Sequence, residues 1–379
     1  MVRASSKHLA YLSAVPLLFF GAGCNILDGG DDDSWPRGQG PDAGFVTRHT
    51  HDAALAPDAA DAGTDADDAG TEASEAGAAD LGIAFTVVVL PDTQYYSSSH
   101  AEIFAAETRW IVEQKSARNI SVALHVGDIV DGANDPAQWM VASSSLRLLD
   151  GIVPYVIVPG NHDSDGNRMG LIDNYFAPKT MGWITNTMTT GQIENNYTLV
   201  DIGPQQWLVL GLEFGPRDAV LTWADGVLKA FPNLPAIIVT HAYLYGDGTR
   251  YDVAKSGMDA SQPNFQAFIP QSYNYTLQEG SNDGEQIWQK IIVPNPNVRL
   301  VFSGHDSGAA RLTSLRPDGS RVHQMLSDYQ WLDDSGGSGY LRVLQFDYGQ
   351  KQVRVQTYSP YLDQFMTDDA NQFTLSLEI

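Results

Sequence analysis

Five short segments of this sequence carry side chains that could hold metal ions, and each follows a run of apolar residues. Asp92, Asp128 and Asn161 offer carboxylate or amide oxygens, and His241 and His305 offer imidazole nitrogens. These ligand types bind hard to borderline divalent or trivalent ions. Two such ions, about 3.5–4 Å apart, can hold the attacking and the leaving oxygen of a phosphoryl displacement. The residue types therefore indicate a metal site that could serve such a reaction, and the segments are residues 91–94, 127–131, 160–163, 241 and 304–307.

The apolar runs before these segments are rich in β-branched residues, which predicts strands buried on both faces. Amphipathic stretches between them predict helices, and this alternation is typical of parallel strands. The carboxyl ends of parallel strands lie along one edge of a sheet, so the five segments should converge. We expect strands at residues 85–90, 122–126, 154–158, 236–240 and 299–303, and helices at residues 102–118, 138–149, 219–229 and 285–292.

The remaining ordered sequence is less regular. Residues 197–202 and 207–213 read as strands, and the tail from residue 322 to 379 alternates apolar and polar residues, which predicts antiparallel strands. Residues 246–284 are long, polar and aromatic without a clear period. A loop of that length is often a lid or a wall of a substrate site.

The motifs Gly127-Asp128-Ile-Val-Asp131, Gly160-Asn161-His162-Asp163, His241 and Gly304-His305 resemble the metallophosphoesterase, or calcineurin-like phosphoesterase, superfamily. They occur in the order of that family, between about residues 85 and 307, each after a predicted strand. The resemblance implies an α/β fold with four layers, α/β/β/α, around two mixed sheets. It also implies an enzyme, a phosphatase or phosphodiesterase that uses a metal-activated water at a dinuclear site.

The resemblance assigns a role to each metal-binding residue. Asp128 would bridge two ions, which would be Mn, Fe or Zn. Asn161, His241 and His305 would complete the ligands of the second ion, and Asp92 would bind the first.

The same resemblance implies the catalytic residues. His162 would contact the phosphate and protonate the leaving oxygen, Asp163 would orient its ring, and Asp131 would support the site. Arg311 lies just past the last motif and is our candidate for substrate binding, because a guanidinium matches phosphate geometry. Arg217 and Arg250 are weaker candidates of the same kind.

Two positions depart from the family's pattern. The first motif is usually Asp-x-His, but this chain has Gln94 in place of the histidine, and the last is usually Gly-His-x-His, but this chain has Ser307. Gln94 could bind the first ion through its amide oxygen or donate a hydrogen bond nearby. Water, Asp306 or Tyr329 could fill the remaining gap. The departure keeps open an alternative function, a degenerate phosphate-binding module with one metal and no catalysis.

Simpler explanations exist for single residues. Asp92 and Asp128 taken alone could be helix caps. His125 lies inside a predicted strand, where a hydrogen-bonded core histidine is the usual case. The five segments taken together favour metal binding.

Residues 1–24 have the pattern of a secretory signal, with basic Arg3 and Lys7, an apolar stretch at residues 9–20 and small residues before Cys24. The ending resembles a bacterial lipobox, which implies a lipid on Cys24 and export to the outer membrane or the cell surface. A cleaved soluble signal and a retained anchor are the alternatives. Cys24 is the only cysteine in the 379 residues, so no disulfide within the chain is possible.

Residues 25–80 hold 14 Asp or Glu and 2 Arg within a chain whose net charge is −24. They are poor in aromatic residues, which is typical of a disordered acidic tether. The acidic balance argues against nucleic acid as a partner, because phosphate backbones bind basic surfaces. We therefore expect a phosphoesterase domain at residues 81–379 that acts as a monomer on a phosphoester and is tethered to a membrane by its lipid anchor.

Overall fold

The structure is a computed structural model that describes residues 84–166, 168 and 170–378. The predicted signal segment, Cys24 and the predicted tether lie outside the described residues. No helix among the described residues combines the length and the apolar character needed to cross a membrane.

Two seven-stranded sheets form the centre of the described region, and the first has the order β13-β12-β11-β1-β2-β3 with β14 paired to β12. Strands β1, β2 and β3 are parallel, and β1 pairs antiparallel with β11. The first sheet therefore joins the start of the domain to its tail. Its strands are β1 (Phe85–Leu90), β2 (Ile120–His125), β3 (Tyr155–Ile157), β11 (Leu341–Asp347), β12 (Gln352–Ser359), β13 (Gln364–Met366) and β14 (Phe373–Ser376).

The second sheet has the order β4-β5-β6-β7-β8-β10-β9. Strands β6, β7, β8 and β10 run parallel, and the outer strands are antiparallel to their neighbours. Both sheets are therefore mixed. The strands are β4 (Asn186–Thr187), β5 (Asn196–Ile202), β6 (Gln205–Leu212), β7 (Ala236–Thr240), β8 (Val298–Ser303), β9 (Gly308–Leu315) and β10 (Arg321–Asp328).

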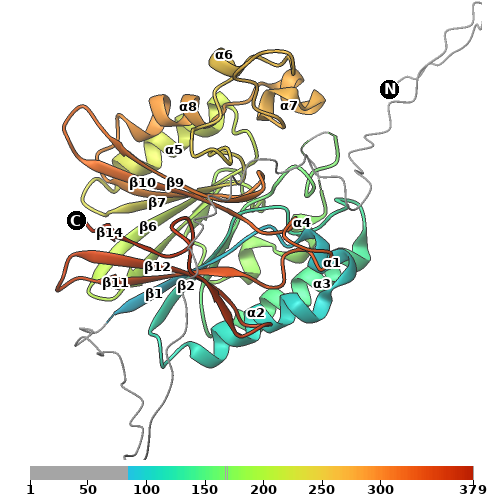
Figure 1. Cartoon of the computed structure of the whole chain (residues 1–379), viewed down its shortest axis with the longest axis vertical. Coiled ribbons are helices and arrows are strands. Elements are labelled where there is room, and N and C mark those ends of the chain that lie inside the picture. Colours follow the sequence, from blue (N-terminus) through green and yellow to red (C-terminus); the bar gives the residue numbers. More distant parts are fainter. Residues whose placement is uncertain (1–83, 167, 169, 379) are drawn as a thin grey trace, which may run out of the picture. The chain divides into compact units, whose positions relative to one another are not determined.

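Helices cover the outer face of each sheet, which gives the expected four layers (Figure 1). One apolar core fills the space between the sheets, a second lies between the first sheet and α2 and α3, and a third lies between the second sheet and α5 and α8. The four-layer α/β/β/α prediction is confirmed. The helices are α1 (Gln94–Ser99), α2 (Ala101–Gln114), α3 (Pro136–Leu146), α4 (Ile172–Tyr175), α5 (Asp218–Ala230), α6 (Val253–Ser256), α7 (Asn274–Glu279) and α8 (Gly284–Ile287).

Most predicted elements occur within a few residues of their expected positions, but three features differ. Helix α1, which begins at Gln94, was not among the predicted helices. The predicted helix at residues 285–292 starts as α8 and continues as a π-helix at Trp288–Ile292. Strand β10 was expected to be antiparallel to its neighbours, and it pairs antiparallel with β9 but parallel with β8.

A side chain joins the two sheets close to the ends of their parallel strands. Asn196 on β5 is fully buried, and its amide donates to the carbonyl oxygens of Ile157 on β3, at 3.1 Å, and of Ile193, at 2.7 Å. Buried carbonyl groups need such partners. Asn196 therefore fixes the exit of β3, from which the next motif emerges, against the second sheet.

The core under α2 contains an acidic side chain without a counter-charge. Glu107 is fully buried, and neither of its carboxyl oxygens has a hydrogen-bond partner. Burial raises its pKa well above the ordinary value of 4.5. The folded protein therefore keeps a proton on Glu107 at a pH where the unfolded chain has released it.

This proton makes a testable contribution to stability. Because the unfolded chain binds fewer protons than the folded protein above about pH 4.5, the free energy of unfolding falls as the pH rises through this window, by at most about 1.4 kcal/mol per pH unit. Glu107→Gln should remove that fall, so the variant gains stability relative to wild type between pH 5 and pH 8. Urea unfolding at several pH values measures this. Glu102→Gln, an exposed change on the same helix, should keep the wild-type dependence of the free energy of unfolding on pH. If Glu107→Gln and wild type showed the same dependence on pH, Glu107 would not retain a proton in the folded protein.

Candidate metal centre

The carboxyl ends of β1, β2, β3, β7 and β8 meet at one edge of the two sheets, as the sequence predicted. Three of the residues that follow these strands offer ligand atoms that lie within 4.8 Å of one another, and all three side chains are buried. These residues are Asp128, His241 and His305. One carboxylate and two imidazoles at this spacing fit a single metal ion.

Asp128 is at the centre of this group. Its backbone has φ 49°, in the left-handed region, and its Oδ1 accepts a hydrogen bond of 3.0 Å from the backbone N–H of His162. Its Oδ2 lies 3.2 Å from Nε2 of His241. Burial raises the pKa of Asp128, but the imidazoles of His241 and His162 outweigh burial and hold the pKa below the ordinary range. Asp128 is therefore an anion inside the protein.

His241 is fixed in one tautomer by the backbone. Its Nδ1 lies 2.9 Å from the carbonyl oxygen of Val126, and a carbonyl can only accept, so Nδ1 carries a proton. Its Nε2 then faces two further acceptors at 3.2 Å, Oδ2 of Asp128 and Oδ1 of Asn161. Three electron-rich atoms at this distance need a positive charge among them. A proton on Nε2 can supply it, because burial lowers the pKa of His241 but Asp128 outweighs burial and raises the pKa above its ordinary value. A metal cation fits the same arrangement.

His305 is oriented in the same way by a different element. Its Nε2 donates to the carbonyl oxygen of Phe268 over 2.7 Å, which leaves Nδ1 with a lone pair. Burial, helped by the nearby His241, lowers the pKa of His305 to about 3, so the ring is neutral. A neutral imidazole held by a second hydrogen bond is the usual state of a metal ligand.

Asp92 and Gln94 are both about 1% exposed beside this group. Oδ2 of Asp92 accepts from the backbone N–H of His305 over 3.0 Å, whereas Oδ1 has no hydrogen-bond partner. The amide oxygen Oε1 of Gln94 also has none. Buried oxygens without partners cost free energy. A cation coordinated by them would remove this cost, so the residues fit a first metal position as well.

Glycines allow these side chains to approach one another. A Cβ on Gly304 would lie 1.9 Å from Oδ1 of Asp92, and one on Gly160 would lie 1.9 Å from Oδ1 of Asp128. Gly127, at φ +105°, faces the ring of His241 in the same way. Only a residue without a side chain fits at these positions.

A model of the calcineurin-like phosphoesterase family matches residues 85–308, the span that carries all of these groups. This chain belongs to the calcineurin-like phosphoesterase family. Family membership implies divalent metal ions and supports a metal-dependent phosphoester hydrolase.

Individual relatives cover different shares of the chain. The uncharacterized protein YvnB of Bacillus subtilis strain 168 is 34% identical over 314 residues, which are 78% of this chain and 22% of that protein. The chain thus spans about a fifth of that relative. Among solved structures, the purple acid phosphatase PPD1 from yellow lupin has a TM-score of 0.47 and 14% identity, covering 78% of this chain and 54% of the phosphatase. A dimetal phosphatase from Danio rerio has a TM-score of 0.44 and 13% identity, covering 78% and 99%.

Asp163 has a different role from the one the family resemblance implied. Its carboxylate accepts from the backbone N–H groups of Ile129 (2.9 Å), Val130 (3.0 Å) and Gly160 (2.8 Å). Asp163 therefore ties the second motif of this phosphoesterase to the third, and its oxygens are engaged by backbone. The expectation that it orients the ring of His162 is wrong.

His162 is oriented by Asp131 instead. Its Nδ1 lies 3.0 Å from the carbonyl oxygen of Asp131 and 3.4 Å from the carboxylate oxygen Oδ1. The side chain of His162 is 23% exposed, more than that of Asp128 or His241. Burial lowers the pKa of His162, but the carboxylate of Asp128 and the carbonyl of Asp131 outweigh burial and raise it above the ordinary value. The ring is therefore biased toward the protonated form on the exposed side of the site.

Two proposed substitutes for the missing histidines face other parts of the protein. Oδ2 of Asp306 accepts from the backbone N–H of Gly246 over 2.5 Å. The hydroxyl of Tyr329 lies 3.0 Å from the hydroxyl of Thr357 and donates to Oδ1 of Asn371 over 2.9 Å. Both groups therefore have structural partners away from Asp92.

The remaining candidate residues from the sequence contact other protein groups. His125 bonds to the hydroxyl of Thr93 and accepts from the N–H of Gly127, so it is the hydrogen-bonded core histidine that was expected. The guanidinium of Arg311 lies 4.3 Å from the ring centroid of Phe373, so its substrate contact stays a prediction. Arg217 pairs with Glu213, and Arg250 pairs with Glu285.

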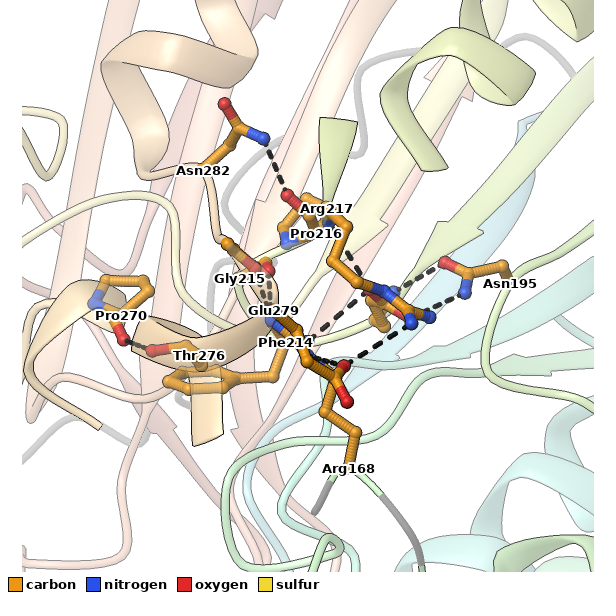
Figure 2. A network of polar contacts seen from close by, with 12 residues as sticks. Arg168, Asn195, Phe214, Gly215, Pro216, Arg217, Pro270, Thr276, Glu279 and Asn282 are labelled. Atoms are coloured by element: carbon orange, nitrogen blue, oxygen red, sulfur yellow. Dashed lines mark hydrogen bonds and ion pairs between the residues drawn. The ribbon is translucent and has the colours of Figure 1, made fainter. Parts of the chain in front are cut away.

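Arg168 supports the site and was not identified from the sequence. It donates to the carbonyl oxygens of Phe214 (2.6 Å), Gly215 (2.9 Å) and Gly280 (3.1 Å), as Figure 2 shows in part. These contacts join the loop after the third motif to the end of β6 and to residues 246–284. Phe214, which packs edge-on against His305 with centroids 5.2 Å apart, is thereby held in place.

The role of Asp163 leads to a prediction. Asp163→Ala should lower the free energy of unfolding by about 3 kcal/mol, because three buried N–H groups would lose a charged acceptor. Urea unfolding measures the change. Asp131→Ala, which removes an exposed carboxylate, should cost less than about 1 kcal/mol. Equal stabilities for the two variants would contradict the structural role of Asp163.

Proposed function

We propose that this chain hydrolyses phosphoesters at the metal centre, with Asp128 shared between two ions. The observation that carries the proposal is the group formed by Asp128, His241 and His305, whose buried ligand atoms lie within 4.8 Å of one another. Backbone carbonyls orient both imidazoles, and such orientation is typical of a site built to bind metal.

The chain's own residues would position a phosphoester and its reacting groups. When bound, the ions would polarise the phosphoryl oxygens and lower the pKa of the attacking water. His241, His305 and Asn161 would hold one ion, and Asp92 and Gln94 would hold the other. Asp128 would contribute its carboxylate to both.

His162 is placed to act as a general acid. Its Nδ1 faces the carbonyl of Asp131, so Nε2 is the nitrogen left to donate a proton to the leaving oxygen. Its backbone N–H binds Asp128, which ties the position of the ring to the bridging carboxylate. A raised pKa keeps more of the ring protonated near neutral pH, which favours this role.

Replacing this acid should separate catalysis from metal binding. In the purified protein, His162→Asn should lower the turnover of bis-p-nitrophenyl phosphate and p-nitrophenyl phosphate by about 10²–10⁴-fold. The amount of bound metal, measured by elemental analysis, should not change. His100→Asn, on the surface between α1 and α2, is the matched control and should turn over at the wild-type rate.

Two other outcomes would count against the proposal. An unchanged rate in His162→Asn would remove the acid role. A wild-type protein that binds one ion and shows no turnover with Mn, Fe or Zn would instead be the degenerate binding module.

We also propose that the protein is exported and lipid-anchored through Cys24. The support is the sequence of residues 1–24, with its basic start, apolar stretch and small residues before the cysteine. The acidic residues 25–80 would then space the enzyme from the membrane, because like charges extend a chain.

The anchor can be tested by labelling. Bacteria expressing the wild-type chain and given radiolabelled palmitate should yield a labelled protein in the membrane fraction. Cys24→Ser should carry no label, because Cys24 is the only cysteine in the chain. An unlabelled wild-type protein would show that no lipid is attached.

A further inference from the structure

The family's pattern provides two imidazoles for the first metal, and this chain has Gln94 and Ser307 in their places. A first metal therefore needs other ligands. Asp328, the last residue of β10, is a buried carboxyl group that lies outside the family's motifs.

The register of the second sheet brings Asp328 to the edge where the site lies. Strand β10 runs parallel to β8, with Leu326 opposite Ser303. Asp328 lies two residues beyond Leu326, as His305 lies two residues beyond Ser303. The backbone N–H of His305 binds Oδ2 of Asp92, so Asp328 ends its strand at the level of the first-metal residues.

Gln330 holds the carboxylate of Asp328 in place. Its backbone N–H donates to Oδ1 and its side-chain Nε2 donates to Oδ2, both over 2.9 Å. Gln330 is 4% exposed, and its own Oε1 has no hydrogen-bond partner. Both contacts to Asp328 come from neutral donors, so its carboxyl group is held in position without a counter-charge.

Imidazoles are the basic side chains beside these carboxyl groups in the described residues, with Nε2 of His241 3.2 Å from Oδ2 of Asp128 and 3.9 Å from Oδ2 of Asp92. Among the ion pairs of the described residues, none joins a lysine or an arginine to Asp92, Asp128 or Asp328. Asp92 follows β1 and Asp328 ends β10, level with His305, whose backbone N–H binds Asp92. A cation held between the two carboxyl groups would stabilise both.

Three of the residues at or next to these strand ends also carry oxygens without hydrogen-bond partners. Oδ1 of Asp92, Oε1 of Gln94 and Oε1 of Gln330 are all buried without hydrogen-bond partners. The hydroxyl of Thr93, between Asp92 and Gln94, instead accepts from Nε2 of His125 over 2.9 Å and donates to the carbonyl oxygen of Ile129 over 3.3 Å.

We propose that Asp92, Gln94 and Asp328, together with the shared carboxylate of Asp128, form an oxygen-only site for a hard divalent cation such as Mn²⁺ or Mg²⁺. This inference deepens the proposed function and rests on it. Carboxylate and amide oxygens favour Mg²⁺, Ca²⁺ and Mn²⁺, whereas imidazoles suit Zn²⁺ and Fe. The second position, with His241 and His305, therefore takes a different metal from the first, and the centre is a mixed pair.

Metal titration of the whole protein tests the site without measuring activity. Protein loaded with one equivalent of Zn²⁺ should then bind one equivalent of Mn²⁺, and electron paramagnetic resonance measures this binding. Asp328→Asn should weaken Mn²⁺ binding by about 10–100-fold while the first Zn²⁺ binds as in wild type. Unchanged Zn²⁺ binding also shows that the variant is folded. Asp333→Asn makes the same chemical change at an exposed position and should bind both ions normally.

A gain of binding gives a second, independent readout. Gln94→His restores the imidazole of the family's pattern, so the first site should shift its preference from Mn²⁺ toward Zn²⁺ by at least about tenfold. Calorimetry with Zn²⁺ would show this as a tighter second step.

The outcomes separate this inference from the proposed function. Wild-type Mn²⁺ affinity in Asp328→Asn, or an unchanged metal preference in Gln94→His, would overturn the oxygen-only site. Binding of only one ion by wild type would overturn it too, even if that protein hydrolyses phosphoesters. The predicted titrations without any phosphoester turnover would support the oxygen-only site and defeat the proposed function.

Discussion

The burial of three carboxyl groups at one edge of two sheets is the constraint on which the rest of this site depends. Asp92 and Asp128 are each at most 2% exposed, and Asp328 is fully buried. A carboxylate removed from water costs several kcal/mol unless it is neutralised. The surroundings supply backbone N–H groups and imidazoles, which lessen this cost but do not remove it. The fold is therefore built around a place for cations.

Close packing is the second condition for such a place. Gly127, Gly160 and Gly304 let the carboxylates and the ring of His241 approach within van der Waals distance of the backbone. Three residues at the site that do have side chains, Asp128, His305 and Phe268, adopt positive φ values of 49°, 77° and 58°. Backbone strain of this kind costs free energy and persists only where the surrounding structure enforces it.

The sequence predicted the strands because β-branched runs are a local signal. Strand β7 was predicted with its observed limits, and β1 likewise, and the residues after each strand could then be placed by a general rule of parallel sheets. The group of Asp128, His241 and His305 could therefore be predicted, because it follows from local patterns in the sequence.

Features that depend on contacts between distant parts of the chain could not be predicted from the sequence. Arg168 binds carbonyl groups 46, 47 and 112 residues away, and backbone carbonyls carry no sequence signal. Asp163 could face a ring or a loop, and only the folded loop shows which. Asp328 reaches the site because β10 is parallel to β8, whereas the alternating tail suggested antiparallel neighbours.

The hydrogen bond from His305 to the carbonyl oxygen of Phe268 connects residues 246–284 to the metal centre. Phe268 is 41% exposed, and its ring lies edge-on to His305 with centroids 6.5 Å apart. The segment that carries this exposed aromatic ring thus also fixes the tautomer of His305. Exchanging residues 246–284 would therefore change the hydrogen bond that orients His305 as well as the exposed surface of the segment.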